Sequence, residues 1–346
     1  MTVRRRLVEA LERDPGLQVV GEAGDGKAAI ELCQSLKPDL VSMDMMLPEM
    51  TGLAVTEYVM AYCPTPILVV SASTNRGELY KTYEALAAGA VDVLEKPVDG
   101  DEAWDEEYRA RVRLVARIKV ITHPRARLSA RAEAAAGGLP AAPAAGAGED
   151  GALKALAIGA STGGPGALRQ ILSGLPADFP LPLLLVIHIG RAFGAAMADW
   201  LDGISRLRVA WARDGEPLPA PGQGRVLMAP PDHHLVLEAG RLRLTQAPER
   251  HSCRPSVDVL FESLARELGA RCAACLLTGM GRDGASGLLA LRQAGARTFA
   301  QDEESCVVWG MPREAVLLGA AERVLPLDRM AGALAAVARG KGREAA

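Results

Sequence analysis

Ser161 is the side chain whose surroundings most suggest nucleophilic chemistry. It lies in GASTGG (159–164), which satisfies the pattern G-x-S-x-G and follows the apolar run ALAI (155–158). This pattern predicts a sharp turn between a strand and a helix that exposes the serine hydroxyl. Taken alone the match is weak, because glycine-rich turns before helices also bind phosphate or simply pack closely. A nucleophilic serine also needs a general base and a residue that orients the base.

Two further strand ends offer those partners. His188 ends the apolar run LLLVIH (183–188), and Asp283 lies in LLTGMGRDGA (276–285), just beyond another apolar run. Because parallel strands end at one edge of a sheet, these side chains are predicted to meet Ser161 there. The chain order Ser, His, Asp differs from that of α/β-hydrolases, so another fold is expected to carry this triad.

Other residues compete for roles in such a site. On composition alone His233, His234 and His251 are alternative bases, although the first two lie in a segment that resembles a structural hairpin. In CRPSVD (253–258), the side chains of Arg254, Ser256 and Asp258 either line the cleft or cap the following helix. Capping by Ser256 or Asp258 is favoured, since serine and aspartate are preferred N-cap residues.

Six scattered cysteines do not form a dense disulfide framework, so reduced thiols are expected. Cys272 and Cys275 have C-x-x-C spacing, but they lie in an apolar run that is typical of a buried strand. With no second ligand pair nearby, a metal or redox role for this pair is not favoured.

The elements that must position these residues fall into two α/β halves. Strand and helix patterns alternate both before and after a stretch at 123–150 that has almost no bulky apolar residues, and the first predicted strand is LQVVGEA (17–23). We therefore predict a first domain at 1–122, a flexible linker at 123–150 and a second domain at 151–346. The fold class is α/β, with a parallel sheet in each domain and a doubly wound sheet in the second.

Composition excludes several classes of protein. The formal net charge of −3 provides no broad positive field, so nucleic acid is not an expected partner. The most apolar stretch, at 181–189, is far shorter than the roughly 20 residues that a membrane-spanning helix needs. The N-terminal segment lacks the apolar core of a secretory signal, so we expect no membrane insertion and a cytoplasmic location.

In the first domain, three strand ends carry Asp44, Ser71 and Lys96 in that order. Together with DMMLPEMTGL (44–53), they resemble the receiver domain of two-component response regulators. The resemblance implies that Asp44 accepts a phosphoryl group, that Ser71 moves to hydrogen-bond it and that Lys96 offsets its charge. It also implies a cis peptide bond between Lys96 and Pro97.

The N-terminus of the chain differs from the receiver pattern. Receivers begin with a central strand that ends in an acidic pair for Mg²⁺, whereas this chain begins with a helix pattern at 2–14. The first strand and the acidic pair are therefore expected to be missing, with strand edges left exposed. We interpret the chain as starting at an internal methionine rather than as a receiver that no longer takes phosphate.

A specific resemblance covers the second domain. It resembles the catalytic domain of the chemotaxis protein-glutamate methylesterase (CheB) family, which implies a triad of Ser161, His188 and Asp283, with Thr162 and Met280 beside it. Ile187 and Gly190 depart from the glutamine and proline usual there, which leaves the loop after His188 and the substrate preference less certain. The segments that carry the resemblance are GASTGGPGAL, VIHIGRAFGAAMADWL, CRPSVDVLF, LLTGMGRDGASGL, AQDEESCVVWGMP and VLPLDRM.

The resemblance also implies an activity. It predicts hydrolysis of glutamate γ-methyl esters on methyl-accepting chemotaxis receptors, with release of methanol, and deamidation of receptor glutamines. No cofactor is implied for hydrolysis, and Mg²⁺ serves receiver phosphorylation, for which a chemotaxis histidine kinase is the implied phosphodonor. In intact members the unphosphorylated receiver covers the catalytic cleft. Two alternatives stay open: a response-regulator adaptor with a silent effector domain, and a hydrolase of small esters.

Overall fold

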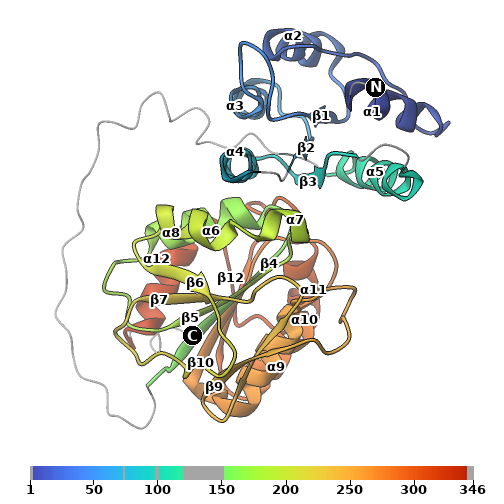
Figure 1. Cartoon of the computed structure of the whole chain (residues 1–346). Coiled ribbons are helices and arrows are strands. Elements are labelled where there is room, and N and C mark those ends of the chain that lie inside the picture. The colour runs from blue at the N-terminus through green and yellow to red at the C-terminus, as the bar shows by residue number, and fades with distance from the viewer. Residues whose placement is uncertain (1–2, 73–74, 98–100, 119, 121–151, 341–346) are drawn as a thin grey trace, which may run out of the picture. The chain divides into compact units, whose positions relative to one another are not determined.

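The structure is a computed structural model that describes residues 3–72, 75–97, 101–118, 120 and 152–340. The chain divides into two compact units, residues 1–138 and 139–346 (Figure 1). The predicted linker at 123–150 lies outside the described residues.

The N-terminal unit is built on a parallel sheet with the strand order β1-β2-β3. The middle strand is buried at all five of its positions, which explains its continuous apolar sequence ILVVS. Helices α1 and α5 contact each other, and α3 contacts both α2 and α4. The elements are α1 (Val3–Glu12), α2 (Gly26–Leu36), β1 (Val41–Met43), α3 (Gly52–Tyr62), β2 (Ile67–Ser71), α4 (Arg76–Ala87), β3 (Asp92–Glu95) and α5 (Glu102–Val115).

Two expectations for this unit are wrong. The apolar segment at 17–23 forms no strand, because its backbone pairs with no other strand among the described residues. The peptide bond between Lys96 and Pro97 is trans, and in the described part of the chain the cis bond is instead Arg254–Pro255.

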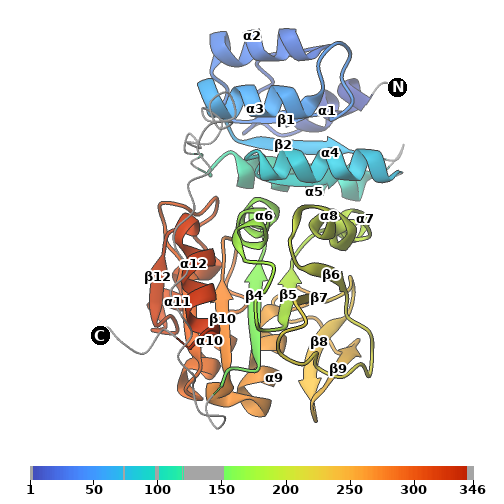
Figure 2. The same ribbon diagram turned by 90° about the vertical axis from the view of Figure 1, so that its left-hand side faces the viewer.

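The C-terminal unit contains a seven-stranded parallel sheet with the order β12-β11-β10-β4-β5-β7-β6. The chain runs outward from β4 in one direction and later returns to its other side at β10, so the two halves of the sheet meet between β4 and β10. Figure 2 shows β10, β4 and β5 side by side. The strands are β4 (Ala155–Ala160), β5 (Leu183–Ile187), β6 (Arg208–Trp211), β7 (Arg225–Met228), β10 (Cys272–Leu276), β11 (Arg297–Gln301) and β12 (Arg323–Leu325).

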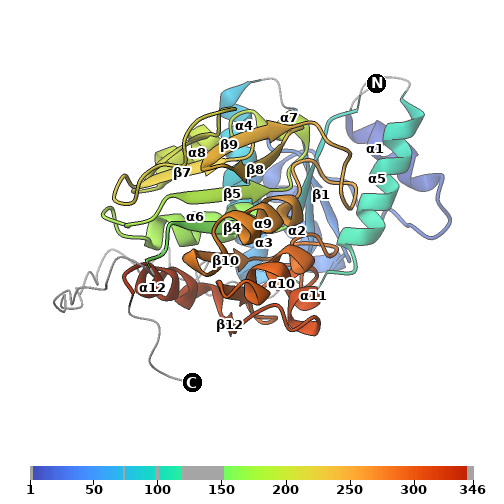
Figure 3. The same cartoon turned by 90° about the horizontal axis from the view of Figure 1, so that it is seen from below.

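Helices cover both faces of this sheet. Helices α6 and α8 lie on one face, while α9 and α10 lie side by side on the other (Figures 1 and 3). Every residue of β4, β5 and β10 is buried between them. None of the helices in the described ranges is long and apolar enough to span a membrane. The helices are α6 (Gly164–Gly174), α7 (Arg191–Gly194), α8 (Met197–Ile204), α9 (Val257–Glu267), α10 (Ala285–Gln293), α11 (Met311–Leu317) and α12 (Leu327–Ala338).

Helix α9 approaches the sheet closely at Gly159 in β4. A Cβ atom at this position would lie 2.3 Å from Cγ1 of Val257, so a larger residue would push the start of α9 away. The predicted hairpin is also present, with β8 (His234–Glu238) antiparallel to β9 (Arg241–Thr245). The hairpin contacts α9 and leads into the segment before it. These contacts hold the N-terminus of α9 beside the end of β4.

Candidate active site

Ser161, His188 and Asp283 follow three adjacent strands at one edge of the sheet. Ser161 comes directly after β4 and His188 directly after β5, while Asp283 lies in the loop between β10 and α10. The Ser161 backbone N–H donates to the Thr278 carbonyl at 3.0 Å, which joins the end of β4 to the loop after β10. The turn into α6 needs Gly163, whose φ of +78° is a conformation that favours glycine.

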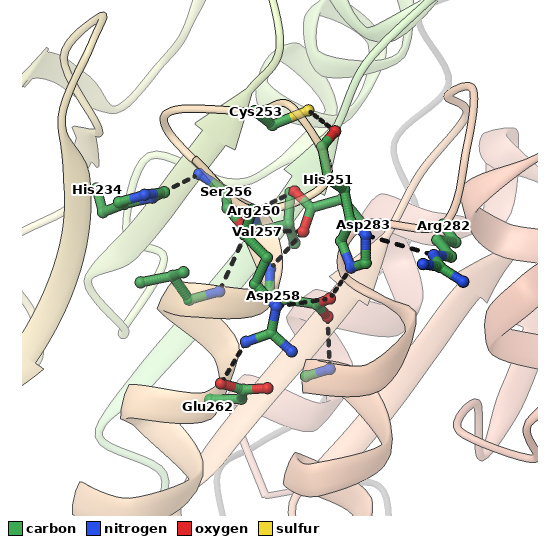
Figure 4. A network of polar contacts seen from close by, with 12 residues as sticks. His234, Arg250, His251, Cys253, Ser256, Val257, Asp258, Glu262, Arg282 and Asp283 are labelled. Carbon is green, nitrogen blue, oxygen red and sulfur yellow. Dashed lines mark hydrogen bonds and ion pairs between the residues drawn. The ribbon is translucent and has the colours of Figure 1, made fainter. Parts of the chain in front are cut away.

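The carboxylate of Asp283 contacts the imidazole of His188. Its Oδ2 lies 2.9 Å from Nε2 of His188, and the Asp283 side chain is only 2% exposed. Oδ2 also accepts the backbone N–H of Val257 at 2.7 Å, while Oδ1 accepts the Ser256 hydroxyl at 2.7 Å and the Asp258 N–H at 3.1 Å (Figure 4). Asp283 is thus held in place by the first turn of α9.

These contacts shift the pKa values of both partners. Burial by itself raises the pKa of Asp283, but the hydrogen bond and charge of His188 and the donors at α9 outweigh it and leave that pKa lowered. Burial lowers the pKa of His188, yet the hydrogen bonds to Asp283 and Cys253 outweigh it and raise that pKa to about 9. The imidazolium form of His188 is therefore stabilised in this site.

Cys253 is a neighbour of His188 that the sequence reasoning missed. Its Sγ lies 3.7 Å from Nδ1 of His188, the ring nitrogen that does not face Asp283. The segment CRPSVD suggested roles for Arg254, Ser256 and Asp258 but none for its cysteine, which lies 65 positions from the histidine. The contact depends on how the segment before α9 folds back onto the end of β5.

The competing histidines have other partners. His234 is fully buried in β8, where Nε2 contacts the Pro248 carbonyl and Nδ1 accepts the Ser256 N–H. His233 Nδ1 contacts a neighbouring carbonyl, and His251 Nε2 lies 3.2 Å from Oδ2 of Asp258. Among the described contacts, the Asp283 carboxylate pairs with His188 rather than with these three.

The remaining predicted residues lie as follows. Ser256 is the N-cap of α9, as expected, and its hydroxyl accepts the N–H of Val259. The Thr162 carbonyl accepts the hydroxyl of Thr278 at 2.9 Å, and Met280 lies partly exposed in the loop after β10. Arg254 forms an ion pair with Asp232.

Cys272 and Cys275 are fully buried in β10, and burial raises the pKa of each thiol.

In the N-terminal unit, Asp44 and Lys96 lie beyond two strand ends and form an ion pair. Lys96 Nζ is 2.7 Å from Oδ2 of Asp44, and Oδ1 accepts the backbone N–H of Met46 at 3.0 Å. Ser71 ends β2, the strand between them, and its buried hydroxyl accepts a hydrogen bond from Thr82. The ends of the three parallel strands thus bring Asp44, Ser71 and Lys96 to one edge.

The described residues around Asp44 do not fit a magnesium ion. Mg²⁺ binds carboxylate and other oxygen ligands, but one Asp44 oxygen is paired with the Lys96 ammonium. Neither of the two groups of His, Cys, Asp and Glu that are close enough to hold a metal, among the residues described, includes Asp44. Among the described residues, Asp44 therefore stands without the further oxygen ligands that Mg²⁺ needs.

Two known protein families match the sequence of this chain. The family described as CheB methylesterase matches residues 156–334, and the response regulator receiver domain matches residues 1–105. A protein-glutamate methylesterase/protein-glutamine glutaminase 2 of Anaeromyxobacter dehalogenans is 45% identical over 97% of this chain and 94% of its own. The chain belongs to the CheB methylesterase family. A similarly named Pseudomonas aeruginosa protein is 45% identical over 98% of this chain and 95% of its own.

A solved structure supports the CheB assignment for the C-terminal unit. The Thermotoga maritima CheB methylesterase catalytic domain is 37% identical, with a TM-score of 0.51, and the match covers 54% of this chain and 99% of that one. The predicted fold class, a receiver joined to an α/β methylesterase domain, is confirmed. Membership of the CheB family also confirms the predicted enzyme class, a hydrolase of chemotaxis signalling that carries a response-regulator receiver.

Proposed function

We propose that Ser161, His188 and Asp283 hydrolyse glutamate γ-methyl esters on methyl-accepting chemotaxis receptors. The observation that carries the proposal is the 2.9 Å contact between His188 and the buried Asp283, at the sheet edge where Ser161 follows β4. Asp283 receives Nε2–H of His188, which leaves the lone pair of Nδ1 to take the serine proton. The serine oxygen then attacks the ester carbonyl. As the C–O bond of the ester breaks, the His188 imidazolium gives its proton to the departing methoxide, so methanol leaves and His188 is neutral again.

The tetrahedral intermediate needs donors for its oxyanion. We assign this role to the backbone N–H groups of Thr162 and Gly163, which follow Ser161 at the start of α6. A helix N-terminus favours negative charge, and each such donor contributes about 3 kcal/mol to transition-state stabilisation in other hydrolases. Water activated by neutral His188 hydrolyses the acyl-enzyme and regenerates Ser161. A glutamine amide enters the same pathway with ammonia as the leaving group.

The proposal also assigns a role to each of the other parts of the chain. Residues 1–122 form the receiver, 123–150 the linker and 151–346 the catalytic domain of a cytoplasmic protein. By its match to the receiver pattern Asp44 is the phosphoryl acceptor, with Ser71 and Lys96 as its switch residues and a chemotaxis histidine kinase as phosphodonor. The described residues beside Asp44 supply no second carboxylate for the Mg²⁺ that this step requires. The ion pair between Lys96 and Asp44 supports these roles, since a lysine in this position offsets the charge of an acyl phosphate.

The test is methanol release from methylated receptor membranes by the full chain. Ser161→Ala is expected to lower the rate by roughly 10³-fold or more, because it removes the nucleophile. Ser173→Ala is the matched control, since its hydroxyl lies on the exposed side of α6 and bonds only within that helix. If the chain is an adaptor without catalytic activity, neither the natural chain nor Ser173→Ala will release methanol. If it is a hydrolase of small esters, it will cleave small esters but not the methylated receptors. Either outcome overturns the proposal.

A further inference from the structure

The contact between Cys253 and His188 has the dimensions of a metal site. The Sγ of Cys253 lies 3.7 Å from Nδ1 of His188. A zinc ion binds sulfur at about 2.3 Å and nitrogen at about 2.05 Å, which at a tetrahedral angle separates the two ligand atoms by about 3.6 Å. We propose that Cys253 and His188 bind a zinc ion that inhibits the enzyme.

In the neutral form of His188, which carries its single N–H on Nε2, the groups around this point have more electron pairs than protons. Besides Nδ1 of His188, the thiol of Cys253 contacts the backbone carbonyl of His251 at 3.4 Å. When Nε2–H is directed at Asp283, both Nδ1 and the carbonyl are acceptors, and the single S–H proton can serve only one of them. A zinc ion removes this mismatch, because it binds the deprotonated sulfur and the Nδ1 lone pair together.

Asp283 does not bind the zinc ion itself but supports the site through His188. Its two oxygens already receive four hydrogen bonds, from Nε2 of His188, the N–H groups of Val257 and Asp258, and the hydroxyl of Ser256. A carboxylate offers about four lone-pair positions, so none is left for a metal. It instead holds the far nitrogen of the ring, as carboxylates commonly do for zinc-bound histidines, and so directs Nδ1 toward Cys253.

A neighbouring group of side chains is a poorer metal site. His251, Asp258 and Asp283 also bring their ligand atoms within 4.8 Å of one another. Both ring nitrogens of His251 are engaged, however, Nε2 with Asp258 and Nδ1 with Nε of Arg282 (Figure 4). The guanidinium of Arg250 lies 3.6 Å from Asp258. The two guanidinium groups repel a cation, so the pair of Cys253 and His188 is the favoured site.

Zinc at this point has a direct consequence for the proposed mechanism. Both ligands are partly exposed, so a metal ion can enter from solvent. Bound zinc occupies the Nδ1 lone pair of His188 and leaves two tetrahedral positions to water. The inhibitory effect rests on the proposed function, because it requires that Nδ1 take the proton of Ser161. The metal site itself does not depend on that function.

The first experiment measures binding. The full chain is first freed of metal with a chelator and then dialysed against zinc chloride. The zinc that stays bound is measured by atomic absorption. We expect the natural chain to take up about one more zinc ion than Cys253→Ala or Cys253→Ser. Cys63→Ala, which removes a partly exposed free thiol in the receiver, is the matched control and should bind like the natural chain. Equal uptake by the natural chain and the Cys253 variants would overturn the site.

Cobalt(II) gives a second readout that identifies the ligand. A cobalt ion on a thiolate produces sulfur-to-metal charge-transfer absorption, which is expected in the natural chain and in Cys63→Ala. The absorption should disappear in Cys253→Ser, whose side chain keeps nearly the same shape. If the absorption persists in that variant, another cysteine is the ligand and the assignment fails.

The last measurement is methanol release, with each variant compared to its own metal-free rate. Saturating zinc should lower the rate of the natural chain by about tenfold or more, reversibly with chelator, and that of the Cys253 variants by less than about twofold. Zinc that binds through Cys253 without lowering the rate would overturn the inhibitory role and count against His188 as the base. Absence of Cys253-dependent binding would overturn the site alone and leave the proposed esterase untouched.

Discussion

The hydroxyl of Ser256 donates to Oδ1 of Asp283 at 2.7 Å, so the N-cap of α9 also holds the carboxylate that contacts His188. One side chain thus links the start of a helix to the proposed active site. The same end of α9 lies close to β4 at Gly159, where a Cβ atom would lie 2.3 Å from Cγ1 of Val257. Folding of the helix terminus and orientation of the imidazole are coupled through this contact.

Ser256→Ala is expected to lower both stability and activity. Loss of the N-cap should cost about 1 kcal/mol of unfolding free energy, and loss of the bond to Asp283 should lower kcat by roughly tenfold. Thr51→Ala removes a comparable N-cap from α3 in the receiver, where the side chain accepts the Ala54 N–H. Urea unfolding should show a larger destabilisation in Ser256→Ala, which also loses the buried bond to Asp283, than in Thr51→Ala. Methanol release should show a large fall in kcat only in Ser256→Ala.

Asp283→Asn should lower kcat by about 10³- to 10⁴-fold, because an amide no longer fixes the proton on Nε2 of His188. Asp258→Asn is the control, since Asp258 is equally buried at the start of α9 but accepts from Gly287 and His251 instead. Its kcat should stay within about threefold of the natural value. A similar fall in kcat in both variants would mean that the Asp283 effect is merely structural.

The pH dependence of the metal-free enzyme follows from the raised pKa of His188. The proposed base must be neutral, so kcat/KM should rise with pH, reach half its maximum near pH 9, the pKa of about 9 in the folded chain, and level off about one pH unit above that value. The imidazolium also stabilises the fold, and because its folded pKa exceeds the unfolded value of about 6.5, this contribution is complete below pH 6.5 and lost between 6.5 and 9.

Activity and stability should therefore change in opposite directions across that window. Rates measured from pH 6 to 10, beside thermal unfolding at each pH, test the prediction. A kcat/KM that is already constant from pH 7 upward would contradict the pKa assigned to His188. Cys253→Ala should move the rise to lower pH, since the hydrogen bond that Nδ1–H of the imidazolium donates to the Cys253 sulfur is one of the contacts that raise this pKa.

The receiver depends on a buried charge between its first and last helices. Asp105 in α5 is 4% exposed and pairs with Arg6 at 3.0 Å and with Arg13 at 3.3 Å, both in the N-terminal segment. Asp105→Asn leaves Arg6 without its buried partner and should cost about 2–4 kcal/mol in the unfolding of the receiver. Glu107→Gln on the same helix removes an exposed pair with Arg111 and should cost less than about 0.5 kcal/mol.

Local patterns were sufficient to predict much of the fold. Continuous apolar runs such as 183–187 and 272–276 are buried strands, because a strand covered on both faces has no need of polar residues. Helix starts followed from capping residues such as Ser256. The pattern failed at 17–23, where an apolar segment forms no strand because strand formation requires a hydrogen-bonded neighbour, which the sequence of the segment does not specify.

The sequence by itself determined which residues could do chemistry, since Ser161, His188 and Asp283 each follow an apolar strand and their types suit acyl transfer. Tertiary structure alone decided how they are held. The four hydrogen bonds to Asp283 and the contact of Cys253 with His188 join segments between 25 and 95 positions apart. Such contacts depend on strand order and helix packing, and no short-range pattern encodes which distant segments meet.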